Sequence, residues 1–130
     1  HIGKSFDYQY IIDSFKEAQQ LKPDFVVYTG DYVSYDDNEQ ISQLQEVLKY
    51  VVKGSLGTIG ILGNHDYGID YAEEAVAKSI IQSLESAGIT VLRNDAIELN
   101  GINFIGIDAT FQFGIILKAG FFLGILMVGK

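Results

Sequence analysis

The chain has 130 residues, 48% of them hydrophobic, which predicts one folded domain with a core of its own. Its formal net charge of −8 and its pI of about 4.5 exclude a nucleic-acid binder that works by neutralising phosphates. The absence of cysteine excludes disulfides and thiolate metal sites.

The first half of the chain alternates between helical and strand patterns. Apolar residues at helical spacing predict a helix from Asp7 to about Gln20. The continuous apolar run Phe25–Thr29 is typical of a strand in a sheet that is covered on both faces. Residues 36–38 offer N-cap side chains for a second helix, whose apolar face runs from Ile41 to Val51 and which Gly54 ends.

The second half continues this alternation and then changes to a hairpin. Thr58–Leu62 is the next predicted strand, Tyr71–Ala87 the next helix and Ile89–Leu92 a further strand. Residues 96–107 form a predicted hairpin, because Asn100-Gly101 supplies the positive φ angles of a type I′ turn. The order β-α-β-α-β followed by a hairpin predicts a layered α/β domain over residues 1–108.

The final segment, residues 109–130, differs from the rest in its run of Phe, Ile, Leu and Gly. Its uninterrupted part, Ala119–Val128, is too short to span a bilayer, which takes about 20 apolar residues. We interpret the segment as a core strand or helix, or as a distorted C-terminus. The alternative is an interfacial segment that associates with a membrane surface, so we expect a cytoplasmic or membrane-associated protein.

Two polar clusters each follow a predicted strand directly. Thr29-Gly30-Asp31 follows the first strand, and Gly63-Asn64-His65-Asp66 follows the second. In open α/β sheets ligands bind beyond the carboxyl ends of the strands, so both clusters are expected at one edge of the sheet. The glycine that opens each turn allows the backbone to approach a bound group closely.

The side chains of these clusters suit a site for divalent cations. Asp31 can bridge two cations, Asn64 offers an amide oxygen, and His65 can bind metal, donate a proton or contact a phosphate. Asp66 can accept a hydrogen bond from His65. Oxygen and imidazole ligands without sulfur favour Mn, Fe, Zn or similar ions. The same residue types also cap turns, and only the pairing of two clusters favours a site.

The chain resembles the calcineurin-like metallophosphoesterase superfamily, in its bacterial phosphodiesterase form. That family's N-terminal signature is Asp-x-His, then Gly-Asp, then Gly-Asn-His followed by Asp or Glu. His1-Ile2-Gly3 is similar to the end of the first block, Gly30-Asp31 to the second and Gly63–Asp66 to the third. The resemblance covers roughly His1–Asp108.

The resemblance implies a dinuclear metal centre that hydrolyses phosphomonoesters or phosphodiesters with two divalent ions (Mn, Fe, Zn or similar). By analogy His1 would bind the first ion, Asp31 would bridge both, and Asn64 would bind the second and contact the phosphate. His65 would stabilise or protonate the leaving oxygen, and Asp66 would orient His65. The implied substrate is a small-molecule or lipid-linked phosphoester, which an acidic protein can attract through bound cations.

The chain also departs from the family pattern. It begins at His1 rather than Met, so we expect that preceding residues, including the Asp of the first block, were removed or left out. No histidine follows His65, and the family's second layer of strands is expected to be missing. We therefore expect weak metal binding and little or no hydrolase activity from this chain alone.

Two alternatives belong to other functional classes. A non-catalytic binding module on the same scaffold would keep the fold without the chemistry. A copper site built on the N-terminal amine and the imidazole of His1 would need a second nearby histidine. Only His65 is available for that role, and its Asn-His-Asp context fits the phosphoesterase pattern better.

Overall fold

A parallel three-stranded sheet forms the middle layer of the structure, a computed structural model that describes residues 1–3, 7–34, 38–69, 71–108 and 125–129. Its strands are β1 (Phe25–Tyr28), β2 (Gly57–Gly60) and β3 (Thr90–Val91), which lie side by side in that order. Parallel neighbours need crossover connections, and the helices of the chain provide them.

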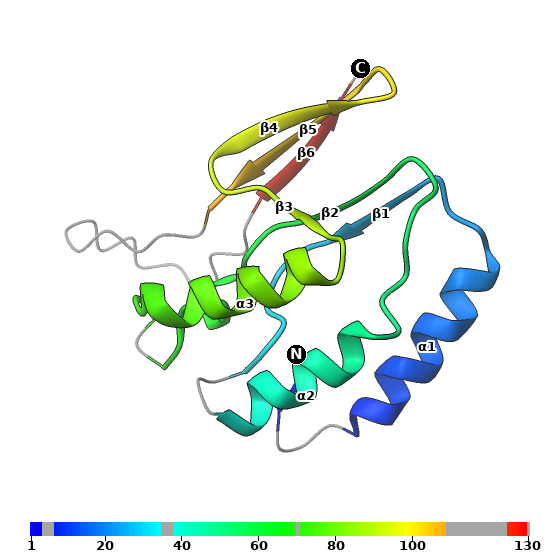
Figure 1. The fold of residues 1–130 in the computed structure, drawn as a ribbon. Helices are drawn as coiled ribbons and strands as arrows, with labels where there is room; N and C mark the ends of the chain where they lie inside the picture. The colour runs from blue at the N-terminus through cyan, green and yellow to red at the C-terminus, as the bar shows by residue number, and fades with distance from the viewer. Residues whose placement is uncertain (4–6, 35–37, 70, 109–124, 130) are drawn as a thin grey trace.

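Three α-helices cover one face of this sheet (Figure 1). They are α1 (Tyr8–Gln20), α2 (Asn38–Leu48) and α3 (Glu74–Ser86). The predicted start of α1 is confirmed, because the Asp7 carboxylate accepts a hydrogen bond from the Gln9 N–H and caps the helix. The predicted end of α2 is wrong: the helix stops at Leu48, well before Gly54.

A second three-stranded sheet covers the opposite face (Figure 1). It contains β4 (Asp95–Leu99), β5 (Ile102–Ile107) and β6 (Ile125–Gly129), all antiparallel. The expectation that the second layer of strands is missing is therefore wrong. The predicted type I′ turn is confirmed, since Asn100 and Gly101 have φ angles of 51° and 78°.

The strand β6 places part of the predicted C-terminal segment within the fold. Its residues pair with β5 from Ile107↔Ile125 to Asn103↔Gly129. Residues 109–124 and 130 lie outside the described residues, so the predicted boundary after residue 108 stays a prediction. Within the described ranges, no helix combines the length and apolar character needed to cross a membrane.

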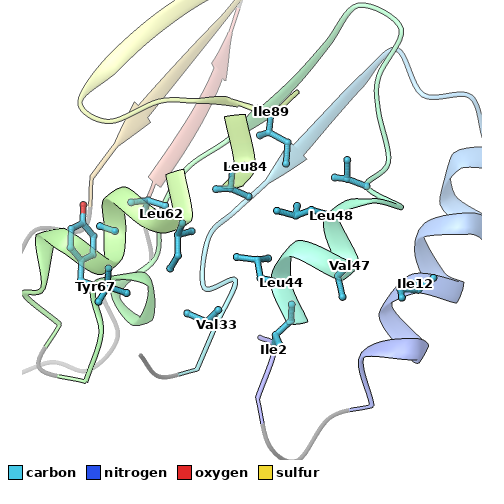
Figure 2. Close-up of a cluster of buried hydrophobic side chains, with 14 residues drawn as sticks. Ile2, Ile12, Val33, Leu44, Val47, Leu48, Leu62, Tyr67, Leu84 and Ile89 are labelled. Atoms are coloured by element: carbon cyan, nitrogen blue, oxygen red, sulfur yellow. The ribbon is translucent and has the colours of Figure 1, made fainter. Parts of the chain in front are cut away.

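Two separate hydrophobic cores hold the three layers together. The first lies between the helices and the middle sheet and contains Ile12, Leu44 and Leu84 (Figure 2). The second lies between the two sheets and contains Ile59 and Phe104. The alternating sides of the strands of the middle sheet therefore face different cores. This confirms the prediction of a sheet covered on both faces.

The edge strand β1 packs against both cores but is not fully buried. Its four residues are all half-buried, although its sequence is as apolar as that of a central strand. Among the described strands only β2 pairs with it, apart from one parallel bridge between Ile2 and Val33 further along its outer side. This bridge brings His1 to the end of the sheet where the polar clusters lie.

Candidate metal centre

The loops after β1 and β2 touch each other through their glycines. A Cβ atom on Gly30 would lie 2.2 Å from the Gly63 nitrogen, and one on Gly63 would lie 2.0 Å from Oδ1 of Asp31. Gly30 also has a φ of 88°, and Asp31 follows with a φ of 55°. The glycines were expected to let the backbone approach a bound group; in the structure they let the two loops approach each other.

The Asp66 carboxylate ties these loops together. Its Oδ2 accepts hydrogen bonds from the backbone N–H groups of Asp31 (2.8 Å) and Gly63 (2.9 Å). Its Oδ1 accepts from those of Tyr32 (2.8 Å) and Val33 (3.4 Å). Because Asp66 is fully buried, these four donors replace the water that a carboxylate would otherwise bind.

Burial has a measurable consequence for Asp66. It raises the pKa of this carboxyl from 3.8 to about 6, although the backbone hydrogen bonds from Gly63, Val33 and Tyr32 lower it. The nearby Asp31 carboxylate raises it slightly further. The pKa of this carboxyl thus reflects two opposing effects: the cost of burying a charge raises it, and the hydrogen bonds that favour the charged form lower it.

Three side chains gather directly above this junction. His1, Asp31 and His65 each offer one ligand atom, and these atoms all lie within 4.8 Å of one another. Nε2 of His1 is 3.6 Å from Oδ2 of Asp31, and the imidazole rings of His1 and His65 are 5.0 Å apart. Two imidazoles and a carboxylate are a donor set that suits Zn, Mn or Fe.

The orientation of His65 comes from a backbone carbonyl. Its Nδ1 lies 2.9 Å from the Ser34 oxygen. Since a carbonyl can only accept, Nδ1 donates this hydrogen bond, and in a neutral imidazole the lone pair then lies on Nε2. The backbone N–H of His65 also donates to Oδ1 of Asp31 (3.1 Å), which leaves Oδ2 of Asp31 directed toward His1.

Asp66 and Asn64 were given other roles by the sequence. Both oxygens of Asp66 accept hydrogen bonds from backbone N–H groups, so the structure supports a role for Asp66 in joining the two loops. The predicted role of Asp66 in orienting His65 stays a prediction. Asn64 is half-buried and begins the 3₁₀ turn η1 (Asn64–Tyr67), next to His65. Its role as a metal ligand stays a prediction.

Ser34 is a residue of the candidate site that sequence reasoning missed. It contributes through its carbonyl group, which every residue possesses, so no residue type at that position signals the contact. Its position three residues after Asp31 in the sequence is an indirect signal, because residues next to a ligand in sequence often lie near the site. That signal is too general to select Ser34.

The described residues line two hollows, and only the smaller one includes residues of the site. One of about 230 Å³ runs along the outer edge of β1 and is lined by His1, Asp31 and apolar side chains of α1 and α2. A larger one of about 470 Å³ lies between α2 and α3 and is lined mainly by Gln and Ser residues. The larger hollow contains none of the three gathered donors, so size does not identify the site here.

The named relatives of the chain are metallophosphoesterases or a phosphodiesterase. It is 31% identical to Phosphodiesterase YaeI of Escherichia coli K12 over 74% of its length, and 32% identical to the uncharacterized metallophosphoesterase YkuE of Bacillus subtilis 168 over 72%. An uncharacterized metallophosphoesterase of Helicobacter pylori 26695 is 28% identical over 82% of the chain. The chain spans 34%, 31% and 27% of the lengths of these relatives, respectively. No solved structure matches it significantly.

The family comparison covers most of the chain. The model described as calcineurin-like phosphoesterase matches residues 1–118, which include both loops and all three gathered side chains. The resemblance noted in the sequence and the layered α/β architecture are consistent with this match. The chain belongs to the calcineurin-like phosphoesterase family.

Proposed function

We propose that the protein of which this chain forms part hydrolyses phosphoester bonds with the help of divalent metal ions. The observation that carries the proposal is the gathering of His1, Asp31 and His65 within 4.8 Å, at the carboxyl ends of β1 and β2. These residues come from three separate segments of the chain. Their convergence on one point therefore depends on the fold and not on sequence proximity.

Electrostatics support a cation at this point. The chain carries a formal charge of −8, and Asp31 would face an incoming phosphate directly. An anionic substrate would be repelled by that carboxylate unless a positive ion lay between them. A bound divalent ion would supply the neutralising charge and the Lewis acidity that phosphoryl transfer needs.

The residues of the chain then divide into two tasks. Oδ2 of Asp31 and the imidazoles of His1 and His65 are the groups available to hold the ion. Nε2 of His65 can perform only one task at a time: where the ion does not occupy it and it is protonated, it is the donor available to a developing negative charge on a leaving oxygen. Asp66 binds no substrate in this proposal; it keeps the two loops at a fixed separation.

The number of ions and the substrate are finer parts of the proposal. We infer a dinuclear centre bridged by Asp31, with Asn64 as a ligand of the second ion, and Mn, Fe or Zn as the metal. A phosphodiester or pyrophosphate in a small-molecule or lipid-linked substrate is the preferred class, supported by the name of the Escherichia coli relative. Among the described residues only three donors gather, which is fewer than the two ions of this proposal would need. The isolated chain therefore fits the alternative of a metal-binding module with little hydrolysis.

Calorimetry with MnCl₂ tests the metal site. The variant Asp31→Asn keeps an oxygen that can accept from the His65 N–H while removing the charge, and we expect it to weaken binding at least tenfold. The matched control is Asp13→Asn, an exposed carboxylate of α1 with a neighbouring lysine. Equal affinity of Asp31→Asn and wild type would contradict the assignment.

Hydrolysis is tested separately with bis-p-nitrophenyl phosphate and Mn²⁺. We expect a longer form that includes the remainder of the family domain to be active, and its Asp31→Asn variant to lose that activity. The 130-residue chain should show little turnover. Robust, metal-dependent turnover by the short chain would refute its proposed incompleteness, and an inactive longer form would favour the binding module.

A further inference from the structure

A second polar cluster begins at Tyr67, the residue that follows Asp66 in the η1 turn. It consists of Tyr67, Glu74, Arg93 and Asp108, and we name it the Tyr67 clamp. The hydroxyl of Tyr67 donates to Oδ1 of Asp108, and Nε of Arg93 donates to Oδ2 of the same carboxylate at 2.8 Å. The outer nitrogens of Arg93 bind both oxygens of Glu74, at 2.8 and 3.2 Å.

The clamp joins four parts of the fold. Tyr67 ends η1, Glu74 begins α3, Arg93 follows β3 and Asp108 follows β5. The Asp108 N–H also donates to Oδ1 of Asn94, 3.0 Å away in the loop after β3. The clamp therefore connects the η1 turn to both sheets and to a helix.

Burial separates the inner half of the clamp from the outer half. The side chain of Asp108 is 2% exposed and Tyr67 is 3% exposed, whereas the side chain of Glu74 is 48% exposed. The guanidinium of Arg93 also lies over the Tyr67 ring, 5.6 Å from its centre. Burial raises the pKa of Tyr67, so its hydroxyl stays protonated and donates to the Asp108 carboxylate at neutral pH.

Two adjacent residues thus connect the η1 turn to two different parts of the fold. Asp66 binds the backbone of the loop after β1, and Tyr67 binds the carboxylate at the end of β5. His65 immediately precedes them, and its ring must keep Nδ1 within hydrogen-bond distance of the Ser34 carbonyl. A small rotation of the turn would move the imidazole away from Asp31 and His1.

We propose that Tyr67, Arg93 and Asp108 are positioning residues that fix the His65 imidazole at the candidate metal centre through the η1 turn. The affinity part of this inference rests on the proposed metal site. The geometric part does not, since the orientation of His65 can be measured without metal. Groups that hydrogen-bond a metal-binding histidine directly commonly change affinity about 10- to 100-fold when they are altered, and Tyr67 acts one step further away, so we expect a smaller effect.

The test compares Tyr67→Phe with Ile80→Val. The first change removes only the clamp's hydroxyl, and the second removes one buried methyl group from α3, in the core and outside the candidate centre. Both variants are expected to be folded and modestly destabilised. Calorimetry should show Mn²⁺ binding at least fivefold weaker for Tyr67→Phe and within twofold of wild type for Ile80→Val. Equal effects of the two variants would overturn the inference.

A metal-free measurement distinguishes failure of the clamp from failure of the metal site. The chain has two histidines, so ¹⁵N-histidine NMR gives two sets of ring signals, which a His1→Gln variant assigns. We expect the His65 ring shifts to change in Tyr67→Phe and to stay unchanged in Ile80→Val. If wild type binds no Mn²⁺ but these shifts follow the prediction, only the metal site is refuted. Unchanged His65 shifts in Tyr67→Phe would refute the clamp.

If Tyr67→Phe does not fold, Arg93→Lys replaces it in both measurements, because lysine keeps the positive charge and loses the paired contacts of the guanidinium.

Discussion

The close contact between the two loops predicts an unusually large effect of adding one methyl group to Gly30. Gly30 and Gly101 both have positive φ angles, 88° and 78°, so alanine is strained at each. A Cβ atom on Gly30 would meet the Gly63 nitrogen at 2.2 Å and the Leu62 carbonyl carbon at 2.6 Å. A Cβ atom on Gly101 would meet nothing within 4 Å. Gly101→Ala is therefore a control that carries the backbone strain without the collision.

The expected losses of stability follow from two costs, the backbone strain and the collision. A left-handed conformation costs a residue with a side chain about 1–2 kcal/mol, so Gly101→Ala should destabilise the chain by about 1 kcal/mol after the entropy change of the unfolded state is included. Gly30→Ala adds a collision with backbone atoms, which cannot rotate away. Overpacking of this kind costs about 1–3 kcal/mol. We therefore expect the free energy of unfolding to fall by about 2–4 kcal/mol in Gly30→Ala.

Urea denaturation measures both variants. If a variant keeps the wild-type dependence of unfolding free energy on urea concentration but unfolds at a lower urea midpoint, then only its stability has changed. Parting the loops should also stretch the hydrogen bonds from Asp31 and Gly63 to Asp66, so Gly30→Ala is expected to weaken Mn²⁺ binding and Gly101→Ala is not. Destabilisation of the two variants within about 0.5 kcal/mol of each other would show that the contact between the loops is unimportant.

Two further predictions concern pH and metal. The pKa of Asp66 is about 6 in the folded chain and 3.8 is its ordinary value, so the folded state binds the extra proton between these pH values. The contribution of Asp66 to the free energy of unfolding is then greatest below about pH 4 and falls by about 3 kcal/mol in total as pH rises through 6. Subtracting the pH profile of Asp66→Asn should reveal this fall. If the difference between the two profiles is flat, burial does not control this carboxyl. Metal removal should lower the melting temperature, since an ion at 100 times its dissociation constant adds about 2.7 kcal/mol. A tenfold loss of affinity reduces this to about 1.4 kcal/mol, so EDTA should lower the melting temperature of wild type by at least about twice as much as that of Asp31→Asn.

Local chemistry explains which parts of the fold were predictable. The hairpin turn at Asn100-Gly101 and the N-cap at Asp7 were predicted correctly because each depends on the residues at that position alone. The end of α2 was predicted too late because Val51 and Val52 are buried like helix residues although they lie in the following loop. An apolar pattern reports burial, and it does not distinguish a buried helix from a buried loop.

Contacts between distant residues explain the parts that were not predictable. The second sheet was not foreseen because β5 pairs with β6, which follows it after a long segment, and nothing local marks that pairing. The Ser34 carbonyl and the Tyr67 clamp were missed for the same reason, since their partners are separated by many residues in sequence. The predicted gathering of Asp31 with His65 succeeded because strand ends in a parallel sheet share one edge.

The site also shows why Gly63-Asn64-His65-Asp66 is informative beyond its ligands. Gly63 allows the two loops to touch, and Asp66 joins them through four backbone hydrogen bonds. Half of the tetrapeptide therefore builds the junction, and His65 places an imidazole above it. Because that junction forms from residues within this chain, the arrangement of His1, Asp31 and His65 does not depend on the further ligands that the proposed dinuclear centre would need. A short chain with weak metal binding and a well-formed junction is the combination that this division of tasks predicts.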